Sequence, residues 1–450
     1  MSARAHIAGA GLAGSLLAVY LARRGMDVVV FERRPDMRRE RISAGRSINL
    51  ALANRGLAAL ARVGLEDAVR RLTIPMRGRM LHDERGKLQL VPYGQQPHEV
   101  IHSISRAGLN ALLMDAAEAT GHVELRFNER VEGIEAAGEL TLRDERVGER
   151  RRVAGAPVIA ADGSGSVIRD ALMALPGARI TEDVLPHDYK ELTIPPGPGG
   201  EHALEKNALH IWPRGGYMLI ALPNLDGSFT VTLFLPHAGG EESFAALTTP
   251  DAVRAFFERA FPDAVPLMPD LVESFFANPT GHMVTVRCTP WHDDGRTLLI
   301  GDAAHAIVPF HGQGMNAAFE DCNELDRCLD AHGDDWGRAF AQFTRLRKPD
   351  AEAIADMALE NYVEMRDVVR DPRFQLHKTL AFELERRHPG VFIPRYSMVM
   401  FHQIPYAQAQ RRGAIQQRIL DALTTTARAL GDVDLERADD LIEKELRPNI

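Results

Sequence analysis

A glycine-rich turn near the start of the chain has the spacing of a dinucleotide phosphate site. Residues 9–14 read GAGLAG, which fits the pattern G-x-G-x-x-G, and Glu32 follows at the end of the next apolar run. In this pattern the first glycine permits the tight turn, the second lets a pyrophosphate approach the backbone, and the third lets a helix pack closely on a strand. A carboxylate at the end of the second strand can accept hydrogen bonds from ribose hydroxyls. The pattern indicates a dinucleotide-binding βαβ unit, with a purely structural βαβ turn as the alternative.

Two later strand-to-turn junctions favour FAD over NAD as the dinucleotide. Residues 156–169 read APVIAADGSGSVIR, and residues 297–316 read TLLIGDAAHAIVPFHGQGMN. Asp302, at the end of its strand, suits a ribityl hydroxyl because carboxylates accept strongly from hydroxyl donors. The helix that opens at Met315 and Asn316 can direct N–H groups and a positive dipole at the anionic pyrimidine ring of reduced flavin. Either junction alone is equally an ordinary βα turn, but together, in this order, they indicate FAD.

The elements that must position these groups are visible in the flanking sequence. His6–Ala8 predicts a buried strand, Ser15–Arg24 an apolar helix, and Asp27–Phe31 a second strand. The N-terminus of the helix supplies free N–H groups and a partial positive charge for phosphates. Residues 1–24 also have the basic start and apolar middle of a secretory signal. Glycines interrupt that apolar run and a strand follows it, so we expect no signal peptide.

A possible metal motif occurs at residues 98–102, which read HEVIH. On a helix, H-E-x-x-H would bind zinc through two histidines one turn apart. Here a proline precedes the motif, and the alternating residues that follow indicate a strand. Residues four apart on a strand lie about 13 Å from each other and cannot share one ion. We therefore predict no metal site.

The composition sets the class of protein. The chain has 450 residues, is 45% hydrophobic and carries a formal net charge of −9, which is typical of a globular protein with two or three domains. The acidic excess argues against nucleic acid as a partner. The cysteines, Cys288, Cys322 and Cys328, are too few for a disulfide framework and fit a reducing compartment. No apolar run reaches the length of a membrane span. We expect a cytoplasmic protein without a membrane anchor, and a homodimer is an open alternative.

Further short motifs occur in a fixed order along the chain. They are GRSINLALANRG (45–56), IPMRGRMLHD (74–83), VPYG (91–94), SISRAGLN (103–110) and VPFHGQGMN (308–316), followed by Asn361 and Tyr396. With the glycine-rich turn, this series resembles the aromatic-hydroxylase family of FAD-dependent monooxygenases, the p-hydroxybenzoate hydroxylase type. The resemblance extends from residue 5 to about residue 410. Within the family, the motifs are most similar to the branch that acts on L-kynurenine.

The resemblance implies an activity and its cofactors. The reaction would be the 3-hydroxylation of L-kynurenine to 3-hydroxykynurenine, with bound FAD, with NADPH and O2 as co-substrates, and through a flavin C4a-hydroperoxide. Only one dinucleotide fingerprint is present, so NADPH would bind transiently. The expectation that the enzyme prefers NADPH to NADH rests on the resemblance alone. Two alternatives stay open: an FAD-dependent hydroxylase of another aromatic acid, and a non-catalytic flavin-binding redox module.

The expected cofactor site combines the residues above with others that the resemblance supplies. Glu32 and Arg33 would hold the adenosine end, and Arg106 and Asp302 the phosphate and ribityl portion, while Ala51, Met315 and Asn316 would line the isoalloxazine. The full set is Gly9, Gly11, Ala13, Gly14, Glu32, Arg33, Ala51, Arg106, Asp162, Asp302, Gly314, Met315 and Asn316.

The resemblance also implies the substrate site. The side chains expected to bind the amino-acid end of the substrate are Arg79, Tyr93, Asn361 and Tyr396, because arginine offers a planar fork to a carboxylate and tyrosine hydroxyls can satisfy its remaining lone pairs. Ile101, Phe310 and Met365 would wall the aniline ring, although each is equally a core residue. The sequence offers no evident general base. His311 and Phe310 are candidates for positions near the edge of the flavin. An equally supported interpretation of His311 is a residue at the entry to a helix whose side chain hydrogen-bonds to the backbone.

Because the expected cofactor and substrate contacts alternate along the chain, its domains must interleave. The fold class we predict is α/β (α+β overall). A Rossmann-type FAD-binding domain would comprise residues 1–75, 96–180 and 285–372. A mixed β-sheet substrate-binding domain would comprise residues 76–95 and 181–284, and a C-terminal helical region residues 373–450. Residues 204–236 predict strands with a turn at 225–228, and residues 338–370 predict one long helix.

Overall fold

The computed structural model describes residues 4–40, 49–135, 138–155, 157–366 and 371–450 of the chain. Some of the sequence predictions include residues outside these ranges. Residues 45–48, the start of the GRSINLALANRG motif, lie outside the described residues, as do residues 367–370 at the end of the predicted long helix.

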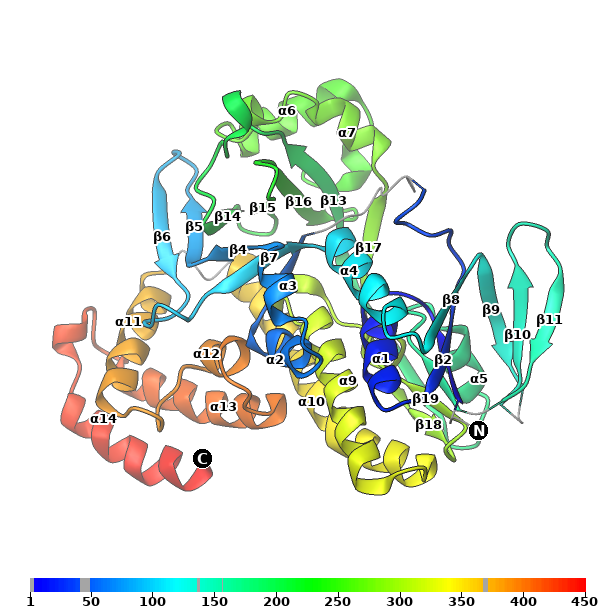
Figure 1. The fold of residues 1–450 in the computed structure, drawn as a ribbon. Helices are drawn as coiled ribbons and strands as arrows, with labels where there is room; N and C mark the ends of the chain where they lie inside the picture. The colour runs from blue at the N-terminus through cyan, green and yellow to red at the C-terminus, as the bar shows by residue number, and fades with distance from the viewer. Residues whose placement is uncertain (1–3, 41–48, 136–137, 156, 367–370) are drawn as a thin grey trace.

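A six-stranded sheet carries the glycine-rich turn (Figure 1). In spatial order its strands are β18 (His292–Asp293), β19 (Thr297–Leu299), β12 (Val158–Ala160), β1 (Arg4–Ala8), β2 (Asp27–Glu32) and β8 (Val123–Phe127). All neighbouring strands are parallel except β18 and β19. Both strands predicted around the turn are confirmed. The helix between them, α1 (Leu12–Arg23), begins earlier than Ser15 because Gly11 already occupies its N-cap position.

Helices and a small antiparallel sheet surround this sheet. The helices are α4 (Arg106–Glu118), α5 (Val167–Leu172), α8 (Asp302–His305), α9 (Gly314–His332) and α10 (Trp336–Arg366), and the small sheet consists of β9 (Glu129–Ile134), β10 (Leu140–Asp144) and β11 (Arg150–Val153). The predicted helix start at residue 314 is confirmed by α9. The predicted long helix is α10, which contains Asn361 and Met365.

A three-stranded antiparallel sheet lies in the segments between the glycine-rich turn and α4. It consists of β3 (Asn49–Leu52), β7 (Ile101–Ser105) and β4 (Thr73–Met76), with α2 (Asn54–Arg62) and α3 (Glu66–Arg70) in the connection. The HEVIH segment ends within β7, so it is not helical, as its context predicts. His98 is exposed whereas His102 is buried in the sheet.

A seven-stranded mixed sheet forms the upper part of the molecule in Figure 1. In spatial order it contains β17 (Thr280–Thr289), β13 (Arg179–Ile194), β16 (Phe229–Pro236), β15 (Met218–Pro223), β14 (Ala208–Pro213), β5 (Gly78–His82) and β6 (Leu88–Pro92). The β14–β5 pair is parallel and the others are antiparallel. The predicted turn at 225–228 connects β15 and β16. Helices α6 (Pro250–Ala260) and α7 (Leu271–Ala277) bury an aromatic cluster against this sheet.

The C-terminal region is helical, as predicted. It contains α11 (Pro372–Arg387), α12 (Arg395–Met400), α13 (Tyr406–Leu423) and α14 (Leu435–Leu441). Helices α11, α13 and α14 share an apolar core of their own, whereas α12 packs into a second apolar cluster with α10 and the strands near Tyr93. Short 3₁₀ turns occupy Pro198–Gly200, Phe244–Ala246, Val265–Leu267, Pro309–His311, Leu430–Asp432 and Arg447–Asn449, and a π-helical turn occupies Ile442–Leu446. Among the described helices, none has the length and apolar character needed to cross a bilayer.

These elements confirm the predicted fold class: an α/β nucleotide-binding part, a mixed sheet and a C-terminal helical region. We propose that the chain divides as the sequence indicates. Strand β5, within residues 76–95, pairs in parallel with β14 of the 181–284 segment, and β6 extends the same sheet by pairing with β5. This pairing is what brings Arg79, on β5, into the substrate-side sheet.

Candidate active site

The glycine-rich turn forms a close junction between β1 and α1. Gly9 has φ of +95°, and a Cβ atom there would lie 2.6 Å from the carbonyl oxygen of Ala161. A Cβ atom on Gly14 would overlap the carbonyl oxygen of Gly9. At Gly11, by contrast, a Cβ atom would meet nothing within 4 Å. Two glycines are therefore required by packing, whereas Gly11 faces open space next to the helix N-terminus.

Glu32 holds this turn from the end of β2. Its Oε2 accepts a hydrogen bond from the backbone N–H of Ala10 at 3.0 Å, and its Oε1 accepts from the backbone and side chain of Arg34. Asn110, from α4, donates to the carbonyl of Ala10 at 3.0 Å, and its own Oδ1 is buried without a partner among the described residues. Arg33, next to Glu32, is exposed.

The two aspartates of the later junctions lie at helix N-termini. Asp162 accepts from the backbone N–H of Val167 at 3.1 Å, and burial raises the pKa of its carboxyl group. Asp302 opens α8 with an exposed side chain, and Arg106 opens α4, also exposed. Asp162 and Asp302 lie at the same edge of the six-stranded sheet as the glycine-rich turn, because they follow the parallel strands β12 and β19, whereas Arg106 follows β7 of the three-stranded sheet.

The start of α9 is tied to β3 through Asn316. Its Oδ1 accepts from the backbone N–H of Ala53 at 2.9 Å, while its Nδ2 donates to the carbonyls of Ala51 and Gly312, both at 2.8 Å. The side chain of Asn316 is therefore engaged in joining two elements. What the helix start at Gly314 and Met315 offers a ligand is its backbone N–H groups.

A buried carboxylate that the sequence did not reveal fixes the Gly301–Asp302 turn. Asp321, on α9, accepts through Oδ2 from the backbone N–H of Gly301 at 2.9 Å and pairs with His305 at 2.7 Å. Its Oδ1 accepts from Nε of Arg347, on α10, at 2.8 Å. The sequence analysis does not single out Asp321, whose role depends on contacts made by the fold.

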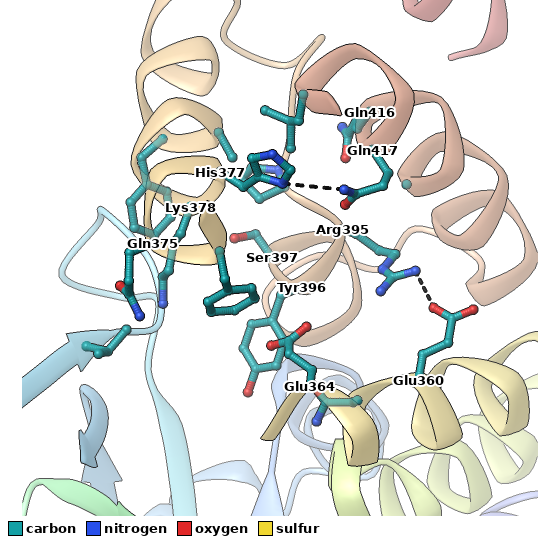
Figure 2. A pocket seen from close by; sticks show the side chains of 18 of the residues that line it. Glu360, Glu364, Gln375, His377, Lys378, Arg395, Tyr396, Ser397, Gln416 and Gln417 are labelled. Carbon is teal, nitrogen blue, oxygen red and sulfur yellow. Dashed lines mark hydrogen bonds and ion pairs between the residues drawn. The ribbon is translucent and has the colours of Figure 1, made fainter. Parts of the chain in front are cut away.

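A cavity of about 470 Å³ brings together the residues expected to bind the amino-acid end of the substrate. Figure 2 shows Tyr396 and Glu364 among the side chains that line it. It lies between α10, α11 and α12 and the end of β6. Arg79, Tyr93, Asn361 and Tyr396 all line it, and His311 lines it as well. An ion pair between Arg395 and Glu360 connects α12 to α10 across its edge.

Arg79 is the charged centre of the cavity and is 7% exposed. Its guanidinium lies 5.0 Å from the ring centroid of Tyr396 and 5.8 Å from that of Tyr93, and the two rings stack with 5.7 Å between centroids. Burial by itself would lower the pKa of Arg79, but Tyr396 and Glu364 raise it, so the group stays charged. Its Nε atom is buried without a hydrogen-bond partner in the described chain. The cavity thus presents a fixed cation with donor capacity left over.

Three of the cavity side chains near Arg79 are uncharged, and Glu364 supplies a carboxylate. Burial raises the pKa of both Tyr93 and Tyr396, so their hydroxyls keep their protons. His311 stacks on Tyr396 with 5.4 Å between centroids, and burial lowers the pKa of its imidazole to about 3, so it is uncharged at neutral pH. Glu364 lies 3.4 Å from Nη1 of Arg79.

The three expected ring-wall residues pack behind the cavity. Phe310 and Met365 share an apolar cluster with Tyr362, and Asn361 donates to both the carbonyl of Phe310 and the sulfur of Met365. Ile101 lies in a separate cluster with Tyr93. None of the three is among the described residues that line the cavity. Their contact with the aromatic ring of the substrate therefore stays a prediction.

Comparison with known proteins gives the family. A sequence model described as an FAD binding domain matches residues 2–358. The kynurenine 3-monooxygenase of Myxococcus xanthus is 54% identical over 443 residues, which cover 98% of this chain and 95% of that protein. The chain belongs to the kynurenine 3-monooxygenase family of FAD-dependent monooxygenases. A second member of the family, from Xanthomonas axonopodis pv. citri, is 49% identical over 441 residues, covering 98% of this chain and 96% of that protein.

A solved structure of a different oxygenase has the same overall fold as this chain. The tetrameric form of 2-methyl-3-hydroxypyridine-5-carboxylic acid oxygenase superposes with a TM-score of 0.67 at 20% sequence identity. The match covers 93% of this chain and 98% of that chain. At this identity the likeness supports the fold and not the substrate.

The residues of this family member fit FAD. The open space at Gly11 lies where a pyrophosphate must approach the backbone, and the unpartnered Oδ1 of Asn110 offers a buried acceptor beside the same turn. Glu32 retains lone pairs for ribose hydroxyls, since a carboxylate oxygen can accept more than one hydrogen bond.

Two cavity residues were missed by the sequence interpretation. Glu364 lies three residues after Asn361 on α10, and this helical spacing was a signal that could have found it. Lys378, on α11, donates to the carbonyl of Pro92 at 2.8 Å, and burial lowers the pKa of its amine to about 7. No pattern in the sequence marks Lys378, because its place depends on how α11 docks against β6.

Proposed function

We propose that this protein hydroxylates L-kynurenine at ring position 3, using FAD, NADPH and O2. The observation that supports this substrate best is the convergence of Arg79, Tyr93, Asn361 and Tyr396 on one cavity, in a chain that belongs to the kynurenine 3-monooxygenase family. These four residues come from three separate parts of the sequence.

The cavity matches the amino-acid end of such a substrate in charge and in hydrogen bonding. Arg79 would bind the carboxylate through its planar fork, and the protonated hydroxyls of Tyr93 and Tyr396 would donate to the remaining lone pairs. Glu364, which pairs with Arg79 at 3.4 Å in this structure, would turn to the substrate ammonium. The carboxylate and the ammonium group of the substrate would thus replace the Arg79–Glu364 ion pair with two ion pairs, one to each of these residues.

FAD would be held by the elements of the six-stranded sheet. The backbone at Gly11 and the N-terminus of α1 would take the pyrophosphate, Glu32 the ribose, and the N-terminus of α9 the pyrimidine edge of the flavin. When bound, FAD supplies the redox chemistry, accepting a hydride from NADPH and activating O2 for insertion of one oxygen atom into the ring. NADPH would bind transiently, since the chain has one dinucleotide fingerprint.

What the chain itself contributes is orientation and the exclusion of water. The ortho-amino group of the substrate makes its ring electron-rich, so the reaction needs no strong base, and the neutral His311 and the protonated tyrosines offer none. Burial of Arg79, Tyr93 and His311 keeps this end of the cavity dry once a substrate fills it. The chain's part of the rate would come from holding the ring at a near-attack distance.

The lowered pKa of the Lys378 amine leads us to expect that substrate binding depends on pH. Below pH 7 its amine is protonated and adds a positive charge to the cavity that binds the carboxylate; above pH 7 this charge is lost. We therefore expect KM for L-kynurenine to increase about fivefold as the pH rises through 7, which equals roughly 1 kcal/mol. Steady-state assays between pH 6 and 8.5 would measure it.

The variant Lys378→Met should remove this dependence and keep the higher KM throughout the pH range. Lys206→Met, which removes an exposed lysine outside the cavity, should behave like the wild type. A KM profile that still changes around pH 7 in Lys378→Met would show that another group is responsible.

The proposed function is tested by NADPH oxidation in air with the FAD-loaded enzyme. L-kynurenine should stimulate oxidation strongly, and 2-aminobenzoate, which lacks the amino-acid end, should not. Equal stimulation by another aromatic acid would point to a different substrate. Bound flavin without any substrate-stimulated oxidation would point to a module without turnover.

A further inference from the structure

Three side chains from neighbouring strands meet on the seven-stranded sheet, away from the cavity. Asp188 lies on β13, His282 on β17, and His237 directly after β16. Nδ1 of His237 is 2.7 Å from Oδ2 of Asp188, and Nδ1 of His282 is 2.7 Å from Oδ1. The three potential ligand atoms all lie within 4.8 Å of one another.

The carboxylate is buried and the two imidazoles are exposed, an arrangement that would let an ion enter from solvent. The side chain of Asp188 is 3% exposed, whereas those of His237 and His282 are 67% and 68% exposed. The imidazole centroids are 6.1 Å apart. Two exposed imidazoles thus both direct Nδ1 at one buried carboxylate.

The three ligand groups determine which class of metal ion would bind. Two imidazoles and one carboxylate, with positions left for water, suit divalent transition metals such as Zn²⁺ or Ni²⁺. Mg²⁺ and Ca²⁺ prefer oxygen ligands throughout. Neutral imidazoles can bind such an ion by moving the proton from Nδ1 to Nε2, which faces solvent here.

The cluster lies where the pairing of β13 with β17 is interrupted. Val184 pairs with Val284, and the next pair is Asp188 with His282, so three residues of β13 stand opposite one residue of β17. These two long strands lead between the seven-stranded sheet and the six-stranded sheet (Figure 1). An ion bound here would connect the side chains of the strands directly beside this interruption.

We propose that Asp188, His237 and His282 form a binding site for a divalent transition metal ion, of which Zn²⁺ is the best match, that joins β13, β16 and β17. The role that we assign to the ion is structural, because its three ligands come from three neighbouring strands or strand ends of one sheet. It was not apparent in the sequence, since His237 and His282 lie 49 and 94 residues from Asp188. The proposal is independent of the proposed function.

The test is a Zn²⁺ titration of the untagged, FAD-loaded, full-length enzyme by calorimetry. We expect one equivalent to bind in the micromolar range, with unchanged affinity in the presence of excess Mg²⁺. His237→Gln and His282→Gln should each weaken binding at least tenfold. Both replacements are at exposed side chains, so folding should persist. His122→Gln is the matched control, because it removes an exposed histidine whose Nδ1 also faces an aspartate, Asp27, at 3.1 Å.

A second readout is thermal. Saturating Zn²⁺ should raise the unfolding temperature of the wild type and of His122→Gln, and leave that of His282→Gln unchanged. The proposal is overturned if the wild type shows no saturable binding. It is equally overturned if His237→Gln and His282→Gln bind Zn²⁺ as tightly as the wild type does.

Discussion

Replacing Arg79 with methionine should lower kcat/KM for L-kynurenine at least 100-fold while the enzyme keeps its FAD. Arg79 is the buried cation of the cavity, and its Nε has no partner among the described residues. Removing one member of a buried charge pair costs roughly 2–5 kcal/mol, which corresponds to about 30-fold to several-thousand-fold in binding. Methionine fills a similar volume without the charge, so the fold should persist. Steady-state kinetics and the flavin spectrum of the purified variant measure both parts.

Two controls make this prediction specific to the substrate carboxylate. Arg77→Met removes an exposed arginine just before the same strand and should leave kcat/KM unchanged. Kynuramine, which lacks the carboxylate, should be a poor substrate for the wild type and no poorer for Arg79→Met. If Arg79→Met lost activity equally on both substrates, Arg79 would be a structural residue and not the carboxylate ligand.

Replacing Gly11 with alanine should weaken FAD binding by roughly tenfold or more without disturbing the apoprotein. The Cβ atom would meet no protein atom within 4 Å, so the chain itself tolerates it, and φ of −74° is an ordinary value. The same methyl group would occupy the space through which a pyrophosphate approaches the backbone. Fluorescence titration of the apoprotein with FAD measures the affinity, and thermal unfolding of the apoprotein measures the fold.

The other glycines provide the comparison. Gly133→Ala also adds a methyl group into open space, but on β9, and should change neither quantity. Gly14→Ala places its Cβ atom against the Gly9 carbonyl and should destabilise the apoprotein. Unchanged FAD affinity in Gly11→Ala would mean that the dinucleotide does not pass over this turn.

The parts of the fold that the sequence predicted are those decided locally. The turn at residues 9–14, its flanking strands and the helix start at Gly314 each follow from glycine positions and apolar runs within a few residues. The earlier start of α1 shows the limit of this approach, because the periodic pattern indicates the helix interior, whereas Gly11 as N-cap residue decides where it begins.

The cavity could be predicted only in part, for a physical reason. Arg79, Tyr93, Asn361 and Tyr396 carried motif signals, and the structure brings them together. Lys378 and Asp321 carried none, because the pKa of one and the hydrogen bonds of the other depend on which helix docks beside them. The place of Asn316 at the flavin stays a prediction, and the structure adds that its side-chain hydrogen bonds join β3 to α9.

The central claim is that this chain inserts one atom of O2 into the ring of L-kynurenine. Turnover of the FAD-loaded enzyme with NADPH and L-kynurenine under ¹⁸O2, followed by mass spectrometry, tests it most directly. We expect a product that coelutes with 3-hydroxykynurenine, carries one ¹⁸O atom and forms in proportion to the NADPH consumed. NADPH consumption that yields only hydrogen peroxide, or a product without the label, would contradict the claim.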